Sequence, residues 1–349
     1  MEKIFEIMPE GWEEAAIREK ALVRGRNIKT PKELLRLNFL YQTQGETYGL
    51  TSALTQISEN QEGLNKTAVK NRIVNSAGWL KWICENLCRQ EGFLVDPPKW
   101  LEKYDVELVD ASDYACNGSR GSDFRFHYMM NLFTMNTTEM YFTKATEGET
   151  LTRYTRIKEN QIIVADRGYC SIREIKYIVE HKGDYVIRMR SNSFNLYRED
   201  GKKFDLTEEL KKDDTPGRKI DLSLFIKRGK EFIPVRICAI AKSYEDVKKS
   251  ERQMKKSNKS RRPLSELQTV WSHFVVVVTS LDRKISTEQI LELYRMRWQI
   301  ELVFKRFKSI FGGREFTARK EESVKAWFYG KLLLAIVCET LAKKGRFSP

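Results

Sequence analysis

The stretch YRMRWQIELVFKRFK, from Tyr294 to Lys308, guides the interpretation of the whole chain. Its polar positions recur at spacings of three, four and seven: Tyr294, Arg297, Glu301 and Lys308. At about 100° per residue they share one stripe of a single helix, roughly 60° wide. A carboxylate flanked there by two cations and a phenol could hold a metal ion beside a phosphate backbone. A plain solvated helix with an ordinary i,i+4 pair between Arg297 and Glu301 is the alternative.

The pattern Y-x2-R-x3-E-x6-K in this stretch resembles the signature of the DDE transposases of bacterial insertion sequences, specifically the Y-R-E-K subgroup of the insertion-sequence-4 family. The resemblance implies that Glu301 is the third carboxylate of a metal site, preceded by two aspartates at strand ends. Asp110 in LVDAS and Asp166 in VADRGY are similar to the family's first and second aspartate motifs. The resemblance therefore extends from Asp110 to Lys308.

The first aspartate also has an ordinary structural interpretation. An aspartate that ends a strand is often an Asx-turn or cap residue, and Asp113 and Asp123 lie close to Asp110 in the sequence. Asp110 is preferred because alternation places it on the same strand face as Val106 and Leu108. The second aspartate is carried by the string DRGY, which precedes a capped helix.

Carboxylates that converge from two strands and a helix supply the hard oxygen ligands that Mg²⁺ prefers. We expect Asp110, Asp166 and Glu301 to be the catalytic residues and to bind two Mg²⁺ ions, for which Mn²⁺ can substitute. Such a pair of ions can activate the attacking oxygen and stabilise the leaving oxygen of a phosphodiester displacement. By resemblance, three residues of the stripe contact DNA phosphates around the cut: Tyr294, Arg297 and Lys308.

The composition favours a nucleic-acid partner. The 349 residues include 62 Lys and Arg against 48 Asp and Glu, so the net charge is +14, and a surplus of this size attracts polyanions. A membrane surface is the competing partner, but there is no lipidation motif or long basic amphipathic tail. The apolar run from Leu332 to Cys338 is too short to cross a bilayer, and the N-terminal MEKIFEIMPEGW has no signal-peptide core.

Cysteine and histidine usage argues against a zinc site. The six cysteines contain no C-x-x-C pair and there are three histidines. Reduced thiols are therefore expected, as in a cytoplasmic, nucleoid-associated bacterial protein. No Walker-type G-x-x-x-x-G-K occurs, which argues against an NTP-driven motor.

Residues 1–97 predict a helical DNA-binding domain. Apolar residues recur at helical spacing over residues 13–23, 30–39, 48–57, 66–74 and 78–88, and Pro97-Pro98 marks a boundary. The third and fourth of these helices flank a polar turn, which is the outline of a helix-turn-helix. Packing within a helical bundle would account for the same pattern. The candidate DNA contacts in the fourth helix are Lys66, Lys70 and Arg72.

Residues 98–189 predict the first part of a ribonuclease-H-like catalytic core. Strands are expected over residues 104–110, 124–132, 140–144, 161–165 and 185–189, with the first ending at Asp110. Residues 147–158 predict a polar segment with a short helix. Ser171-x-x-Glu174 predicts a capping box that opens a helix ending near His181. This order gives a mixed α/β (α+β) fold.

Residues 190–284 predict a β-rich insertion between the second aspartate and the glutamate, as in the resembled family. Hairpin turns are expected at Asp200-Gly201 and Arg228-Gly229-Lys230, and a strand over residues 274–278. The basic segment 248–262 is either a solvated face or linker or a surface that contacts DNA phosphates. Its candidate contacts are Arg252, Lys255, Lys256, Arg261 and Arg262.

Residues 285–349 predict the second part of the core. Ser286-x-x-Gln289 predicts a capping box at the start of the helix that carries the signature. Residues 321–341 predict a helix whose apolar face packs on the core. Elsewhere, His127 is expected to be structural or close to DNA rather than a metal ligand. Trp271 and Trp298 are expected to pack in the core, with stacking on a displaced base as the alternative.

The resemblance implies a cut-and-paste DNA transposase that binds the terminal inverted repeats of its insertion sequence. It would cleave the element ends by metal-dependent hydrolysis and join the 3′-hydroxyls to target DNA. The family works in a paired-end complex, which implies a homodimer on double-stranded DNA. A ribonuclease-H-like nuclease and a catalytically inactive end-binding protein are the alternatives. The three intact carboxylates argue against the inactive protein, and the abrupt ending at Pro349 is compatible with a truncated element.

Overall fold

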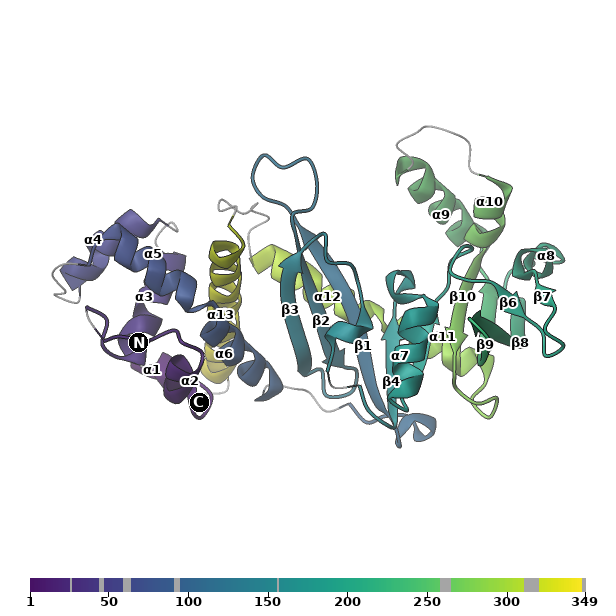
Figure 1. Cartoon of the computed structure of the whole chain (residues 1–349), viewed down its shortest axis with the longest axis horizontal. Coiled ribbons are helices and arrows are strands. Elements are labelled where there is room, and N and C mark those ends of the chain that lie inside the picture. The colour runs from purple at the N-terminus through teal and green to yellow at the C-terminus, as the bar shows by residue number, and fades with distance from the viewer. Residues whose placement is uncertain are drawn as a thin grey trace.

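A mixed sheet runs through the centre of the molecule (Figure 1). The computed structural model describes residues 1–25, 27–43, 47–58, 64–90, 95–155, 157–257, 265–310 and 320–346. Within these ranges ten strands form one sheet in the order β3-β2-β1-β4-β5-β10-β9-β8-β6-β7. The strands are β1 Asp105–Tyr114, β2 Phe124–Asn131, β3 Thr137–Lys144, β4 Gln161–Ala165, β5 Asp184–Arg188, β6 Leu196–Tyr197, β7 Lys203–Phe204, β8 Lys219–Arg228, β9 Glu231–Ala241 and β10 Phe274–Thr279.

Five strands, in the order β3-β2-β1-β4-β5, form the part of the sheet nearest the N-terminal helices. The β1–β2 and β2–β3 pairs are antiparallel, whereas β1–β4 and β4–β5 are parallel. The five strands expected over residues 98–189 are all present. This large mixed sheet is consistent with a ribonuclease-H-like transposase domain.

The strands of residues 190–284 extend the same sheet. β10 pairs antiparallel with β5, and β9, β8, β6 and β7 follow outward. Both expected hairpins are confirmed, since β6 pairs with β7 around Asp200-Gly201 and β8 pairs with β9 around Gly229-Lys230. Gly201 and Gly229 have φ of 79° and 61°, which glycine adopts at no steric cost.

The helices lie at both ends and on both faces of the sheet (Figure 1). The expected helix over residues 13–23 is shorter and ends at Arg18, and Lys20 then has a left-handed φ of 57°. In the polar segment 147–158 the only helix among the described residues is a single 3₁₀ turn. The helices are α1 Glu2–Phe5, α2 Trp12–Arg18, α3 Pro31–Thr43, α4 Tyr48–Ser58, α5 Lys66–Asn75, α6 Ala77–Gln90, η1 Lys99–Leu101, η2 Leu151–Arg153, η3 Arg167–Tyr169, α7 Ile172–Glu180, α8 Leu206–Lys211, α9 Tyr244–Ser257, α10 Glu266–Ser272, α11 Thr287–Met296, α12 Trp298–Ile310 and α13 Glu321–Arg346.

One apolar core joins the N-terminal helices to the sheet. It contains residues of α3, α5 and α6 together with Val106 and Leu108 of β1 and most of the buried face of α13. α13 contacts α3, α5 and α6, and it also contacts α12 and β3 (Figure 1). The expected apolar face of this last helix is confirmed by the burial of Val324, Phe328 and Leu332.

A second core covers the other sheet face beneath α7. Among the described residues no helix is both long and apolar enough to cross a membrane.

The start of α7 differs from the expected capping box. The Ser171 side chain accepts a hydrogen bond from the Glu174 N–H, as expected for an N-cap. The Glu174 carboxylate does not return to the cap. It accepts from the Leu151 N–H at 2.5 Å and from the Thr150 hydroxyl at 3.0 Å. The capping-box prediction is therefore wrong in its second half, because a buried N–H of another segment takes the carboxylate.

The signature stretch forms two helices instead of the single helix expected. α11 ends at Met296 and α12 begins at Trp298, with Arg297 between them. The Arg297 N–H donates to the Tyr294 carbonyl, and the Ile300 N–H donates to the Arg297 carbonyl, both at 3.1 Å. These are i→i+3 bonds, which tighten the chain locally. The prediction of a continuous 60° stripe on one helix is therefore wrong, and Arg297 lies at the junction of α11 and α12.

The start of α11 is fixed in two ways. Ser286 and Gln289 form the expected capping box. Arg236 of β9 donates to both carboxylate oxygens of Asp221, at 3.0 and 2.7 Å. Its remaining nitrogen donates to the carbonyls of Leu281, Asp282 and Ile285 in the loop before α11. Since Arg236 is 6% exposed, this network joins the outer strands firmly to the helix that leads to the candidate site.

Candidate functional site

The register of β1 and β4 brings the two predicted aspartates to the same level of the sheet. The last residues paired between these parallel strands are Val109 and Ala165. Asp110 and Asp166 are the next residues on each strand, so they leave the paired region side by side. Asp166 follows β4 directly, as expected. The expectation that Asp110 ends its strand is wrong, because pairing with β2 continues β1 to Tyr114.

α12 is held over this level by an aromatic cluster. Phe304 and Phe307 contact Phe126 and Tyr128 of β2, with ring centroids 5.8–6.2 Å apart. Edge-to-face rings at this separation bury large apolar areas and restrict rotation. The cluster therefore fixes Glu301, which lies one turn before it on α12.

Arg297 links the first aspartate to the glutamate. Its guanidinium donates to Asp110 Oδ2 at 2.9 Å and to Glu301 Oε1 at 2.5 Å. The Tyr294 hydroxyl donates to Asp166 Oδ1 at 3.1 Å. The structure therefore brings together all three predicted carboxylates with two of the three predicted phosphate-contacting side chains.

Burial and charge act in opposite directions on the two aspartates. Burial raises the pKa of Asp110 to about 6, although the positive charge of Arg297 and the Ala111 N–H oppose the shift. Burial also acts to raise the pKa of Asp166, but the hydrogen bond from the Arg167 N–H and the charges of Arg297 and Arg188 outweigh it. The net pKa of Asp166 is lowered, so this carboxylate is anionic over the physiological range.

The donor chemistry suits a divalent metal ion, but the present arrangement does not. All three side chains offer the hard oxygens that Mg²⁺ prefers. Arg297 nevertheless takes one oxygen of Asp110 and one of Glu301. Of the residues that the structure describes, no group of three or more acidic, histidine or cysteine side chains could hold a metal ion.

The neighbouring polar residues have structural partners. Asp113 accepts two hydrogen bonds from Arg125, at 2.6 and 3.3 Å, and Asp123 accepts one from the Cys116 N–H at 2.7 Å. His127 lies on the opposite sheet face, with its ring nitrogens 3.0 Å from the Thr143 hydroxyl and 3.2 Å from an Arg153 nitrogen. Burial and the nearby Arg153 lower the pKa of His127 to about 3, so the ring is neutral.

Glu149 is a carboxylate at the site that the sequence analysis missed. A Cβ atom at Gly168 would lie 1.6 Å from its Oε2, so the side chain packs directly against the DRGY turn. Burial raises the pKa of Glu149, and the charges of Asp113 and Asp166 add to the shift. The GET string around it contains no motif, so only the fold reveals its position.

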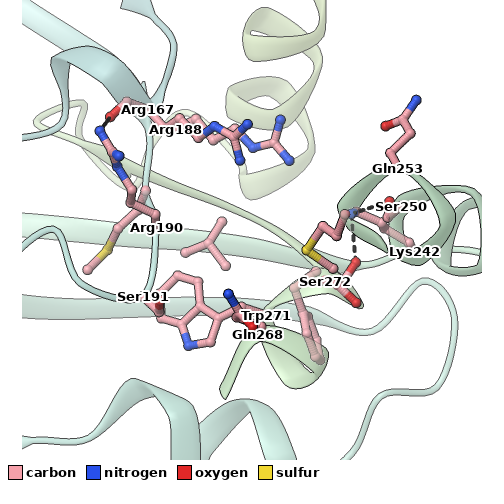
Figure 2. Close-up of a pocket in the computed structure, with 14 residues that line it drawn as sticks. Arg167, Arg188, Arg190, Ser191, Lys242, Ser250, Gln253, Gln268, Trp271 and Ser272 are labelled. Carbon is pink, nitrogen blue, oxygen red and sulfur yellow. Dashed lines mark hydrogen bonds between the residues drawn. The ribbon is translucent and has the colours of Figure 1, made fainter. Parts of the chain in front are cut away.

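A basic pocket opens next to the DRGY turn (Figure 2). It has a volume of about 500 Å³ and lies between the end of β5 and the helices α9 and α10. Lys242 donates to the Ser272 carbonyl at 2.7 Å and to the Ser250 hydroxyl at 3.0 Å. No carboxylate is among its described lining residues. The cations that line it are Arg167, Arg188, Arg190 and Lys242.

These cations were not predicted as DNA contacts, although each of them lies at or just after the end of a strand, which the sequence could have indicated. Arg167 follows β4, Arg188 and Arg190 lie at the end of β5, and Lys242 follows β9. Basic residues just after strands of one sheet can gather at one edge once the strand order is known.

The other predicted DNA contacts are distributed over the surface. Lys308 is exposed, with its Nζ 5.6 Å from the centre of the Tyr114 ring. Lys66 is exposed at the start of α5, Lys70 is partly exposed, and Arg72 donates to the Arg24 carbonyl. On α9 three predicted contacts are exposed: Arg252, Lys255 and Lys256. Two further predicted contacts, Arg261 and Arg262, lie outside the described residues.

The two tryptophans differ. Trp271 packs against the second core and donates to the Thr207 hydroxyl at 3.0 Å, which confirms the expected packing, although its ring also lines the basic pocket. Trp298 is 48% exposed on α12, so the expectation that it packs in the core is wrong.

Comparison with known proteins agrees with this geometry. The family model described as "Transposase DDE domain" matches residues 130–338, a range that includes Asp166 and Glu301 and begins after Asp110. A putative transposase InsL for insertion sequence element IS186A of Escherichia coli (strain K12) is 26% identical over 342 residues, which cover 95% of this chain and 90% of the relative. The transposase for insertion sequence element IS421 of Escherichia coli is 26% identical over 343 residues, covering 95% and 91%.

A more distant relative is the transposase for insertion sequence element IS231F of Bacillus thuringiensis subsp. israelensis. It is 23% identical over 206 residues, which cover 54% of this chain and 43% of the relative. Since the family model spans more than half of the chain, the protein belongs to the transposase DDE domain family and is an enzyme of DNA transposition.

Proposed function

We propose that this chain is a cut-and-paste transposase of the insertion-sequence-4 family, in its Y-R-E-K subgroup. The observation that carries the proposal is the convergence of Asp110, Asp166 and Glu301 with Tyr294 and Arg297 at the level where the β1–β4 pairing ends. Two aspartates from adjacent parallel strands and a glutamate from a covering helix converge here, beside a phenol and a guanidinium, which are groups able to bind phosphate.

In this proposal the three carboxylates are the catalytic residues and the ligands of two Mg²⁺ ions, with Mn²⁺ as a substitute. When bound, the ions would supply charge neutralisation at the phosphate and an activated water. Water attacks the phosphorus at the element end, the P–O bond to the 3′ oxygen breaks, and a free 3′-hydroxyl is left. That hydroxyl then attacks a target phosphodiester, so one P–O bond forms as another breaks.

The cations near the site support a proposed path for the DNA. The basic pocket lies next to the DRGY turn (Figure 2), and α9, which lines part of this pocket, carries the exposed cations Arg252, Lys255 and Lys256. We propose that these surfaces bind double-stranded DNA at the terminal inverted repeats, and that residues 1–97 form a helical DNA-binding domain that uses α5. Residues 98–189 and 285–349 form the catalytic core, and residues 190–284 form the insertion.

The proposed assembly is a homodimer on paired element ends, acting at the nucleoid in the bacterial cytoplasm. With one proposed active site per chain, two copies would place one site at each element end, so that both ends can be cut within one complex.

Cleavage of labelled DNA that carries the element's own ends, with Mg²⁺, tests the proposal. Wild-type protein should cut at the end, and Glu301→Gln should bind the same DNA without cutting it. Unchanged cutting by Glu301→Gln would overturn the assignment of the site. Binding without cleavage in both proteins would indicate a catalytically inactive end-binding protein. Cleavage without joining to target DNA would indicate a ribonuclease-H-like nuclease.

A further inference from the structure

Arg297 is the ion-pair partner shared by two of the three site carboxylates. It contacts Asp110 and Glu301 at 2.9 and 2.5 Å, and its side chain is 10% exposed. Within the described ranges, neither carboxylate has another ion pair within 4.0 Å. The guanidinium therefore supplies the positive charge that these two carboxylates require when they are brought close together.

The position of Arg297 in the fold suits a side chain that changes partners. It lies between α11 and α12 and belongs to neither helix. Its Nε is buried without a hydrogen-bond partner among the described residues. A buried donor without an acceptor is unfavourable, so the present arrangement does not use the full hydrogen-bonding capacity of the side chain.

A phosphate and a metal ion would redistribute these contacts. A guanidinium binds a phosphate through two parallel N–H donors, as it binds a carboxylate. If Arg297 turned to a phosphate, one oxygen of Asp110 and one of Glu301 would lose their cation. A divalent cation could then bind the same oxygens.

Resting on the proposed function, we propose that Arg297 is an exchangeable counter-cation. In the free protein it holds Asp110 and Glu301 together and excludes a divalent metal ion from the two carboxylate oxygens that it contacts. When DNA binds, a phosphate takes the guanidinium and the oxygens become available to the metal. DNA and metal therefore bind cooperatively, and linkage requires that each raises the affinity for the other by the same factor.

The test measures Mn²⁺ binding to the full chain by electron paramagnetic resonance, with and without a duplex that carries the element end. Binding of Mn²⁺ to the duplex alone is subtracted. For the wild type we expect the duplex to raise Mn²⁺ affinity by about tenfold, within the usual range of coupling between sites. This comparison needs no variant, so it holds even if a substituted protein is unstable.

Arg297→Gln isolates the exchange. Without DNA this variant should bind Mn²⁺ about tenfold more tightly than the wild type, because the competing cation is gone, and DNA should no longer raise the affinity. Arg295→Gln is the matched control. It makes the same substitution two residues away on α11, but Arg295 is exposed and pairs with Glu292 at 3.9 Å instead of with the three carboxylates. Its Mn²⁺ affinity should stay within about twofold of the wild type, as expected for an exposed and screened charge.

The outcomes separate the two proposals. If Mn²⁺ binds, but Arg297→Gln binds it no more tightly than wild type and DNA has no effect, the exchange is overturned while the metal site stands. If DNA raises the affinity equally in wild type and Arg297→Gln, the coupling exists but Arg297 does not carry it, and the exchange is again overturned. If no protein binds Mn²⁺ even with DNA, the metal-dependent function fails together with the exchange.

Discussion

Replacing Arg236 by Met should detach the outer strands from the helix that leads to the site. Arg236 forms a bidentate pair with Asp221 at 3.0 and 2.7 Å and donates to three loop carbonyls at 2.8–3.3 Å. The change removes these bonds at once. Asp221 keeps the Thr287 hydroxyl at 2.9 Å and an Arg283 nitrogen at 3.6 Å.

The expected loss follows from the burial of the pair. Removing one partner of a buried ion pair costs about 3–5 kcal/mol, because the other charge is left uncompensated. Asp221 is 31% exposed and retains Arg283 nearby, so solvent and this second cation reduce the penalty. We therefore expect Arg236→Met to lower the free energy of unfolding by about 3 kcal/mol. Arg228→Met, an exposed change in the same hairpin, should cost no more than about 0.5 kcal/mol.

Urea unfolding of the full chain measures the loss, and hydrogen exchange locates it. Amides at the start of α11 should lose protection in Arg236→Met before those of β1 and β4 do. Asp221→Asn should be costly alone but much less so in the Arg236→Met background, with a coupling energy of about 1–3 kcal/mol. A loss below about 1 kcal/mol, or additive effects in the double variant, would refute the reasoning.

Three further predictions concern capping, stability and DNA binding. Ser286→Ala removes the capping box of α11 and should lower the free energy of unfolding by about 1 kcal/mol in urea titrations; an unchanged unfolding midpoint would contradict this. Burial raises the pKa of Glu107 to about 8, so between its unfolded value and pH 8 the folded state retains a proton that the unfolded state releases. Wild-type stability should therefore fall as pH rises from about 5 to 8, by up to about 1.4 kcal/mol per pH unit, and denaturation at several pH values should show a flatter profile for Glu107→Gln. Burial, reinforced by Arg188, lowers the pKa of Lys242 to about 8, so wild-type affinity for DNA should fall by up to about tenfold per pH unit above pH 8. Lys242→Arg stays charged, and fluorescence anisotropy should show that it loses this dependence; an equal pH dependence in both proteins would exclude Lys242 as the titrating group.

Local patterns were sufficient for most of the elements. Short stretches rich in apolar residues predict β2 and β4, and the Ser286 and Gln289 side chains form the capping box that their spacing indicates. Asp166 lies where its string predicts, directly after β4. These features depend on residues within a few positions of one another, so the sequence alone determined them.

Non-local pairing decided what the local patterns could not. β1 continues beyond Asp110 because β2 supplies hydrogen-bond partners as far as Tyr114. The apolar alternation of β1 does not predict this extension. In the same way the Glu174 carboxylate leaves its own helix for the Leu151 N–H, which is 23 residues away. A polar group bonds to whichever hydrogen-bond partner lies near it in the folded protein. Sequence spacing predicts that partner only when the partner is close in the sequence.

The same distinction between local and non-local information applies to the candidate site. The sequence by itself determined which carboxylates are present and which residue types accompany them. Only the tertiary structure decided that Arg297 lies at a helix junction and bridges Asp110 and Glu301, and that Glu149 and the cations of the basic pocket lie beside them. The physical reason is that a charged side chain is placed by the charges and hydrogen-bonding groups around it. In this protein those groups come from strands and helices far apart in the chain.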